Sequence, residues 1–323
     1  MTTITVLMPA FNAARYIAAA VDSVLAQTYQ DLDLLVVDDG STDGTADIVL
    51  TRADDPRVRL LRHPRNLGLV AALNHGLAEC RTDLVARLDA DDTTTPDRLA
   101  LQVKVFADPR VVLCATGHRR IDPGGTTLHV GCPPLTHGAF AVAMLTGNRV
   151  NHSAAMYRAD VVRAAGGYRP EWFPVEDYDL WLRLIGMGRF VGIADVGVVT
   201  VNDAHGVSMQ HSEEQARLHR LRTEIYVRET HGAELSERDL ERLLSADDGN
   251  LRSVRAVARC GANLRADLTG RGLPTTGVDG EARRLALRAM ARRRKLARHL
   301  ILCVGSPRLA LLGVLDDRQR PAT

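Results

Sequence analysis

The sequence has few cysteines and no long apolar run, and both shortages exclude classes of protein. Its five cysteines are scattered along 323 residues without a Cys-x-x-Cys pair, so neither a disulfide framework nor a zinc or thioredoxin-like site is expected. Nowhere do about 18 apolar residues follow one another, and no charged leader with an apolar stretch precedes the first predicted strand. The sequence therefore predicts reduced thiols and a cytoplasmic protein that neither is secreted nor spans a membrane.

Aromatic side chains and net charge are also scarce. Aromatic residues make up 4% of the chain and the formal net charge is +2, which argues against a protein dedicated to nucleic-acid binding. The charge is nevertheless uneven, because residues 281–323 hold 11 Lys or Arg against 3 Asp or Glu. The rest of the chain is correspondingly acidic, so we expect the body and the tail to have different roles.

No Gly-x-Gly-x-x-Gly motif follows the first predicted strand, which ends in Pro9, Ala10, Phe11 and Asn12. The dinucleotide fingerprint of dehydrogenases is therefore missing, and a Rossmann oxidoreductase is not expected. A sugar nucleotidyltransferase would have a Gly-x-Gly-x-Arg loop at this place, so that class does not fit either.

Short β-branched or leucine-rich segments alternate with helical patterns over the first 120 residues, which is typical of βαβ units on a mostly parallel sheet. We therefore predict an α/β fold with helices flanking the sheet. Residues 121–135 are rich in Gly, Pro and Thr, which favours an irregular segment or a hairpin over one sheet edge. From residue 213 the composition is helical, so one domain is expected over 1–210 and a helical region over 211–323. The predicted strands are 4–8, 34–37, 58–61, 84–88, 111–115 and 190–201. The predicted helices are 14–27, 70–78 and 97–106, and residues 175–185 are expected to begin as a loop and continue as a helix.

The clearest candidate site is the run from Leu84 to Asp92, where an apolar strand ends in three carboxylates. Ligands of open α/β sheets bind at the C-terminal ends of parallel strands, where Asp89 and Asp91 could hold a divalent cation and diphosphate oxygens. The alternative is a solvated acidic turn ahead of the helix at Pro96. Both interpretations stay open on this run alone.

A second acidic turn, residues 38–43, follows another predicted strand of the same sheet. A carboxylate there can accept a hydrogen bond from the N–H of a uracil or thymine ring, and we assign this role to Asp39. Ser41 or Asp43 is expected to cap the next helix. The two acidic strand ends would then face one crevice.

Several motifs in register resemble the inverting family-two glycosyltransferases of the GT-A fold, over roughly residues 1–210. The matching segments are 6–12, 23–29, 36–43, 66–68, 86–92, 96–99, 166–168 and 176–183. Processive synthases of that family usually add a Gln-x-x-Arg-Trp motif and transmembrane helices, and this chain has neither. The resemblance implies a non-processive, metal-dependent hexosyltransferase with a nucleotide-sugar half, about 1–120, and an acceptor half, about 121–210.

The resemblance also implies roles for single residues. Asp39 would bind the base, Asp89 would face the ribose or the metal, and Asp91 would ligate Mn²⁺ or Mg²⁺. His205 would lie near the metal and diphosphate, with a surface histidine as the alternative. The residues implied beside the nucleotide are Pro9, Ala10, Phe11, Asn12, Arg65 and Asn66.

The acceptor half would supply the catalytic base. An inverting transfer needs a carboxylate that takes the proton of the acceptor hydroxyl as it attacks the anomeric carbon. The family position of that base corresponds to Asp177, beside Glu176. The alternative for this pair is a helix N-terminus with favourable dipole placement. Trp172 is the candidate for stacking on an acceptor, and His152 and Ser153 are candidates for lining its site.

The basic stretch 281–315 interleaves arginines with leucines. Such a segment can lie on an anionic membrane surface, which would place the protein on the inner face of the membrane and would suit a lipid-linked sugar as acceptor. The alternative is a helix that packs its leucine face on the body. Acceptor choice and homodimer contacts are further roles open to this region.

The expected function is transfer of a sugar, with inversion, from a nucleotide diphosphate sugar to a hydroxyl acceptor. UDP or dTDP is the favoured carrier, and the product would be a polysaccharide, glycolipid or natural-product glycoside. The alternative is a non-catalytic module that keeps the fold and binds a sugar nucleotide or a partner.

Overall fold

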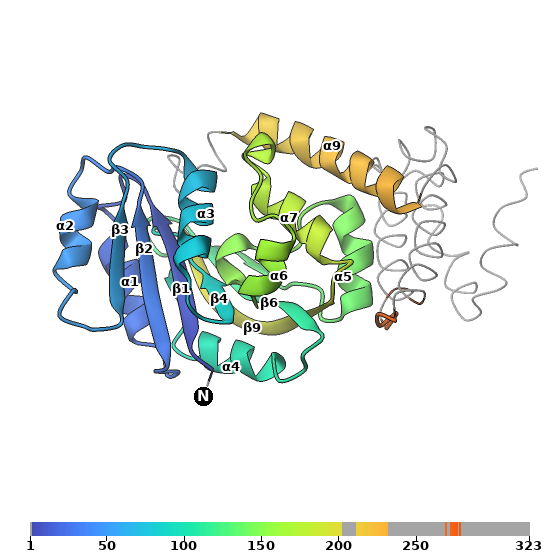
Figure 1. Cartoon of the computed structure of the whole chain (residues 1–323), viewed down its shortest axis with the longest axis horizontal. Coiled ribbons are helices and arrows are strands. Elements are labelled where there is room, and N and C mark those ends of the chain that lie inside the picture. The colour runs from blue at the N-terminus through green and yellow to red at the C-terminus, as the bar shows by residue number, and fades with distance from the viewer. Residues whose placement is uncertain (1, 202–210, 232–268, 270–271, 277, 279–323) are drawn as a thin grey trace, which may run out of the picture.

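The computed structural model describes residues 2–201, 211–231, 269, 272–276 and 278. Within them, nine strands form one curled sheet in the order β3-β2-β1-β4-β8-β6-β9-β5, with β7 paired to β6, and helices cover both of its faces (Figure 1). The strands are β1 Ile4–Ala10, β2 Leu32–Asp38, β3 Val58–Arg62, β4 Leu84–Arg87, β5 Thr93–Thr94, β6 Val111–Ile121, β7 Thr127–Gly131, β8 Ala155–Arg158 and β9 Arg189–Val201. The helices are α1 Ile17–Leu25, α2 Thr45–Leu50, α3 Leu69–Glu79, α4 Arg98–Val105, α5 His137–Ala143, α6 Ala159–Ala164, α7 Glu176–Leu184 and α9 Ser212–His231, with short 3₁₀ turns η1 Met144–Thr146, η2 His152–Ala154 and η3 Pro170–Trp172.

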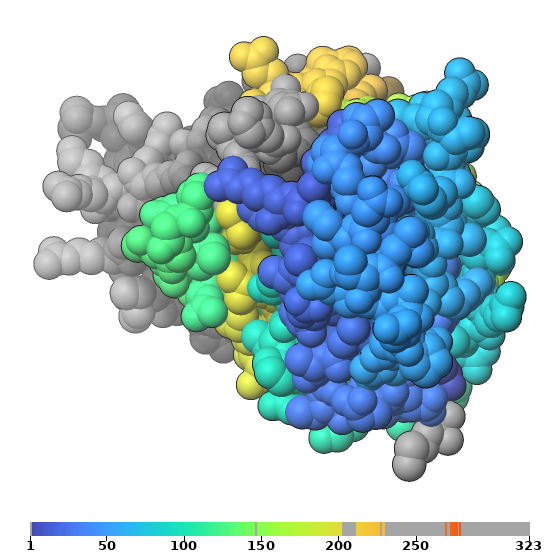
Figure 2. Space-filling view, turned by 90° about the vertical axis from the view of Figure 1, so that its left-hand side faces the viewer, coloured from blue at the N-terminus to red at the C-terminus, as the bar shows by residue number. Residues whose placement is uncertain are grey.

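Four parallel strands form the N-terminal half of the sheet. β1 pairs with β2 on one side and with β4 on the other, and β3 extends the sheet beyond β2, all in parallel. The predicted βαβ rhythm is confirmed. On the side of α2, the N-terminal part of the chain, in blue, forms one continuous face of the molecule (Figure 2). Beyond β4 the sheet becomes mixed, because β8 enters antiparallel between β4 and β6.

β6 is much longer than predicted, since the expected end was residue 115 and the strand continues to Ile121. This extension has no apolar run of its own. It is held on both sides, by the antiparallel β7, which places His118 opposite Gly131, and by the parallel β9. The hairpin alternative for residues 121–135 is therefore confirmed, and strand pairing rather than local composition sets the length of β6.

β1 illustrates why the central strands are apolar at nearly every position. Val6 and Met8 point to one face and share a core with Val21 of α1, whereas Leu7 points to the other face and shares a core with Leu73 of α3. Successive strand residues alternate between the faces of a sheet, and here both faces are covered. A continuous apolar run follows from that arrangement.

Buried polar side chains fix α4 to the sheet next to the acidic turn after β4. The guanidinium of Arg98 donates from Nη2 to the carbonyls of Arg87 at 2.9 Å and Ala155 at 3.0 Å, and from Nε to Gln102 at 3.0 Å. Gln102 donates to two further main-chain carbonyls. Burial lowers the pKa of Arg98 to about 9. These bonds join β4, β8 and α4 into one unit beside that acidic turn.

α9 is tied to α7 by a buried ion pair. Asp179 of α7 accepts from Arg222 Nε of α9 at 2.6 Å and from Arg183 Nε at 2.9 Å, with Asp179 0% exposed. The hydroxyls of Tyr178 and Thr223 lie 2.8 Å apart in the same contact. α9 begins in the region predicted to be helical, and the domain boundary near residue 210 stays a prediction.

Two sequence predictions, His205 and the basic stretch 281–315, lie outside the described residues. Of the helices that the structure describes, none combines the length and apolar composition needed to cross a membrane.

We expect Asp179→Asn to lower the free energy of unfolding by about 3–5 kcal/mol, because Arg222 would be left buried with the exposed Glu229 as its one remaining acidic partner among the described residues. Urea unfolding followed by circular dichroism measures the change. Glu214→Gln is the matched control, since it removes an ion pair with Arg217 that lies in solvent. An unchanged midpoint for Asp179→Asn would contradict this account of how α9 is held.

Candidate active site

The loops after β1, β2, β3 and β4 lie at one edge of the sheet, because parallel strands end on the same side. They bring together most of the residues predicted to bind nucleotide and metal. From later in the chain, η2 and the start of α7 reach the same edge, where Ser153 bonds to Asp89 and Asp177 lies within reach of its charge. The predicted residues placed there are Asn12, Asp39, Arg65, Asn66, Asp89, Asp91, His152, Glu176 and Asp177.

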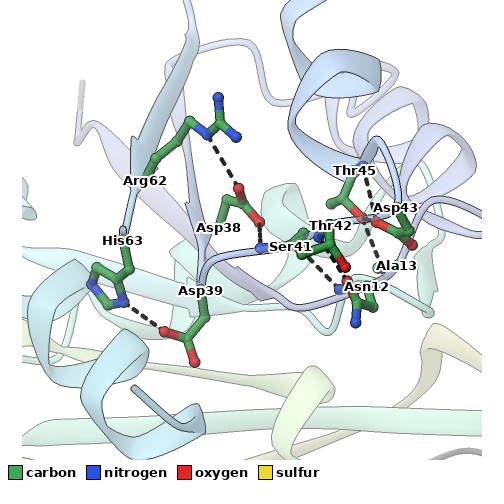
Figure 3. A network of polar contacts seen from close by, with 10 residues as sticks. All are labelled: Asn12, Ala13, Asp38, Asp39, Ser41, Thr42, Asp43, Thr45, Arg62 and His63. Atoms are coloured by element: carbon green, nitrogen blue, oxygen red, sulfur yellow. Dashed lines mark hydrogen bonds and ion pairs between the residues drawn. The ribbon is translucent and has the colours of Figure 1, made fainter. Parts of the chain in front are cut away.

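The loops after β1 and β2 are joined into one unit (Figure 3). The Asn12 N–H donates to Ser41 Oγ at 2.9 Å, and the Asn12 side-chain oxygen accepts from the Thr42 N–H at 3.0 Å. Asn12 adopts a φ of 48°, a conformation that asparagine tolerates better than most residues. Ser41 therefore holds the β1 loop. Of the two residues predicted to cap α2, Asp43 accepts from the N–H of Thr45, the first residue of the helix, although Gly44 occupies the N-cap position itself.

Asp39 is buried and already carries three hydrogen bonds. Its Oδ1 lies 2.6 Å from His63 Nδ1 and accepts from the Leu67 N–H at 2.9 Å, and its Oδ2 accepts from the Gly68 N–H at 2.8 Å. His63 Nε2 lies 2.8 Å from His75 Nδ1. Each carboxylate oxygen has two acceptor positions, so one position on Oδ2 remains. The predicted contact of Asp39 with a base stays a prediction, and it would use that position.

Gly40 allows two loops to approach each other closely. Its φ is +74°, and a Cβ atom there would lie 2.3 Å from the carbonyl carbon of Arg65, so no other residue fits without movement of the backbone. Arg65 and Asn66 are exposed beside this contact. Of the other predicted nucleotide neighbours, Pro9 and Ala10 are buried at the end of β1, whereas Phe11 is 46% exposed.

Asp89, Asp91 and Asp92 follow β4 as a compact acidic group. Each offers a carboxylate oxygen, and these oxygens lie within 4.8 Å of one another. Burial, together with the charges of Asp89 and Asp91, raises the pKa of Asp92. Three converging oxygen ligands on one turn fit a hard divalent cation such as Mn²⁺ or Mg²⁺.

Arg87 and Ser153 hold the first of these carboxylates. Arg87, 1% exposed in β4, forms an ion pair with Asp89 and donates to Ser153 Oγ at 2.9 Å. The same hydroxyl accepts from the Asp89 N–H at 3.0 Å and donates to Asp89 Oδ2 at 2.9 Å. All of the hydrogen-bonding positions of Ser153 are therefore used. Ser153, a candidate for the acceptor side, instead bonds to the predicted metal ligand.

Glu176 and Asp177 begin α7 and differ in their protonation. Burial and the charge of Asp177 raise the pKa of Glu176 to about 8. Burial raises the pKa of Asp177 to about 6, against the opposing effect of a 2.7 Å hydrogen bond from Asn148. At neutral pH Glu176 is mainly protonated and Asp177 mainly ionised, so Asp177 is the stronger candidate for a base.

The other two acceptor candidates, His152 and Trp172, also have partners within the protein. His152 Nε2 lies 2.9 Å from the Tyr168 hydroxyl, and burial with the charge of Arg87 lowers its pKa, so its ring is neutral. Trp172 is partly buried, and the Arg222 guanidinium lies 5.5 Å from the centre of its ring. The guanidinium therefore covers one face of the Trp172 ring. Their acceptor roles stay predictions.

Sequence reasoning missed Arg87, His63 and Asn148. A signal existed for Arg87, because a charged residue inside the apolar strand 84–88 requires a buried partner. No comparable signal marks His63 or Asn148, whose partners lie 24 and 29 positions away in the sequence.

The chain is similar in sequence to known glycosyltransferases. The family model described as "Glycosyl transferase family 2" matches residues 5–165. The chain is 32% identical to the amylovoran biosynthesis glycosyltransferase AmsE of Erwinia amylovora over 62% of this chain and 77% of that protein. It is 28% identical to the chondroitin synthase of Pasteurella multocida (strain Pm70) over 67% of this chain but 22% of that protein. The chain thus spans less than a third of the synthases it matches.

Two solved structures have a similar fold. S. aureus TarS 1–349 in complex with UDP-GlcNAc has a TM-score of 0.58 at 15% identity, covering 92% of each chain. The mannosyltransferase PcManGT from Pyrobaculum calidifontis in complex with GDP-Man and Mn²⁺ has a TM-score of 0.53 at 20% identity, covering 97% of this chain and 88% of the other. These similarities show that the sheet and its helices have the GT-A fold.

We expect Ser153→Ala to weaken Mn²⁺ binding by about 10–100-fold, because the hydroxyl fixes the orientation of Asp89. Mn²⁺ binding is measured by electron paramagnetic resonance of the free ion, and Asp91→Asn serves as the variant that loses a ligand outright. Equal Mn²⁺ affinities for Ser153→Ala and the wild-type protein would show that Asp89 needs no such support.

Proposed function

The chain belongs to glycosyltransferase family 2, and on that premise we propose that it transfers a sugar from a nucleotide diphosphate sugar to an acceptor hydroxyl with inversion. The observation that carries the proposal is the position of Asp177. This carboxylate stands at the start of α7, close enough to Asp89 for their charges to repel. A single displacement needs a base for the incoming hydroxyl and a stabilised leaving group. Asp177 would supply the base, and Asp89 and Asp91 would hold the ion that stabilises the leaving group.

The joined loops after β1 and β2 form the proposed nucleoside site. Asp39 would accept from the base with the acceptor position left on Oδ2, which suits the N3–H of uracil or thymine and keeps UDP or dTDP favoured. Asp89 would face the ribose. The proposed neighbours of the nucleotide are Pro9, Ala10, Phe11, Asn12, Arg65 and Asn66. The bound UDP-GlcNAc of TarS and GDP-Man of PcManGT support a nucleotide sugar donor in general.

Asp91, with Asp89, would hold Mn²⁺ or Mg²⁺ through carboxylate oxygens, with His205 as a further ligand. The bound ion would act as a Lewis acid that stabilises the charge of the leaving diphosphate. Arg87 and Ser153 keep Asp89 oriented toward that position. The Mn²⁺ in PcManGT supports a metal in this fold.

Asp177 would take the proton of the acceptor hydroxyl as the oxygen attacks the anomeric carbon. Its pKa of about 6 leaves it ionised at neutral pH yet more basic than an exposed aspartate. Glu176 remains protonated, because burial and Asp177 raise its pKa to about 8. It would act as a hydrogen-bond donor beside the base.

The acceptor is assigned only by class. The relatives named for amylovoran and chondroitin support a polysaccharide or glycolipid product. Membrane docking through 281–315, a cytoplasmic location, a homodimer and the division at residue 210 stay proposals from the sequence.

Calorimetric titration with UDP, dTDP and GDP, each with and without Mn²⁺, tests the donor site. We expect one nucleotide to bind far more tightly with the metal, and Asp91→Ala to lose that difference because a metal ligand is removed. If no nucleotide binds under any condition, the non-catalytic alternative replaces the proposal.

Asp177→Asn should abolish sugar transfer and leave nucleotide binding intact, because asparagine cannot take a proton. In the wild-type protein, turnover of the donor should fall as pH drops through about 6, since Asp177 then becomes protonated. Release of nucleoside diphosphate, with water as the acceptor, measures both effects. Glu176→Gln is the matched control and should keep the acid limb near the same pH; a limb that disappears in Glu176→Gln instead would assign the base to Glu176.

A further inference from the structure

Asn148 contacts Asp177 with its side chain held in one orientation. The Asn148 Nδ2 donates to Asp177 Oδ2 at 2.7 Å, and its Oδ1 accepts from the Val150 N–H at 3.0 Å. A reversed amide would turn an oxygen toward the carboxylate and a donor toward an N–H, and both contacts would be lost. The Val150 N–H therefore forces the amide nitrogen to face Asp177.

The carboxylate of Asp177 is thereby fixed from both sides. Its Oδ1 accepts from the Tyr178 N–H at 2.6 Å, while Asn148 occupies one position on Oδ2. Each oxygen keeps one acceptor position, and the residue is half-buried. A hydroxyl can therefore approach a carboxylate whose plane is already set.

Some of the groups that face Asp177 raise its pKa and others lower it. Burial and the negative charge of Asp89 raise the pKa, whereas the neighbouring Glu176 is mainly protonated and adds little charge. The hydrogen bonds from Asn148 and from the Tyr178 N–H lower the pKa, as does the charge of Arg87. Tyr168 also faces the group from the loop after α6. Of the side chains among these, Asn148 is a neutral donor that stabilises the ionised form without changing net charge.

We propose that Asn148 is a positioning residue, which orients Asp177 and keeps it ionised for proton transfer. This inference rests on the proposed function of Asp177 as the base. The segment between η1 and η2 would thus orient the base, which neither the acidic cluster nor the nucleotide loops do.

The backbone of this segment has anchors that do not depend on Asn148. The Tyr178 hydroxyl donates to the Met144 carbonyl, the Ala154 N–H donates to the Asn151 carbonyl at 3.0 Å, and Val150 is 2% exposed in the core. Replacing the Asn148 side chain should therefore leave the segment in place, so that the effect on Asp177 can be measured separately.

The test compares the wild-type protein with Asn148→Leu, which has a similar shape but no donor, and with Asn148→Asp, which adds a like charge. The protein is labelled with ¹³C at aspartate carboxyl carbons, and the Asp177 signal is identified as the one missing from Asp177→Asn. We expect a wild-type midpoint at about 6, a midpoint roughly one pH unit higher in Asn148→Leu, and a larger rise in Asn148→Asp. Donor turnover below pH 6 should fall about tenfold in Asn148→Leu, with KM for the donor unchanged.

Asn74→Leu is the control for a purely structural effect. Asn74 makes two hydrogen bonds to the backbone of Tyr168, at 2.7 and 2.9 Å, so its loss should lower the melting temperature without moving the Asp177 midpoint. An Asn148→Leu midpoint equal to that of the wild-type protein would overturn the inference. Donor turnover that persists in Asp177→Asn would overturn the proposed function instead, so the two failures are distinguishable.

Discussion

The carboxylates at the open edge of the sheet are gathered around a buried guanidinium. Asp89, Asp92, Glu176 and Asp177 all lie within reach of the charge of Arg87, whose side chain is almost wholly buried. Like charges in so weakly polar a medium repel strongly unless a cation or a proton offsets them. Arg87 offsets only part of the repulsion, because burial and neighbouring charge still raise the pKa values of Asp92 and Glu176. The remaining negative charge would attract a divalent cation to this edge of the sheet.

The fold brings distant segments together to build this arrangement. β8 inserts beside β4, which carries Ser153 of η2 to the carboxylate of Asp89. Arg98 ties β4 and β8 to α4 with its own buried hydrogen bonds. The family match ends at residue 165, before α7 begins at Glu176. The proposed base therefore comes from a part of the chain that the match does not cover, and its position depends on how α7 packs against the rest.

Local patterns account for what the sequence could predict. The parallel strands, the acidic turns and the helix predicted within 175–185 follow from apolar runs and helical spacing; in that helix Trp181 and Leu184 are fully buried. The end of β6 was wrong by several residues, because pairing with β7 and β9 extends a strand whose own composition does not. The sequence also could not predict contacts between distant side chains, because these too depend on how separate segments pack together. The sequence predicted that Asp39 binds a base, but it did not reveal that His63 and two backbone N–H groups occupy three of its acceptor positions.

The central claim is that the acidic edge beside Asp177 is where the donor diphosphate and its metal sit. The most direct measurement is the anomalous scattering of manganese in a crystal of the protein grown with UDP and Mn²⁺, because it locates the ion independently of the protein coordinates. The account predicts a strong peak bonded to Asp91 and to phosphate oxygens of UDP, with Asp89 still held by Arg87 and Ser153. UDP bound with its diphosphate away from this edge, or manganese bonded to other residues, would contradict the account.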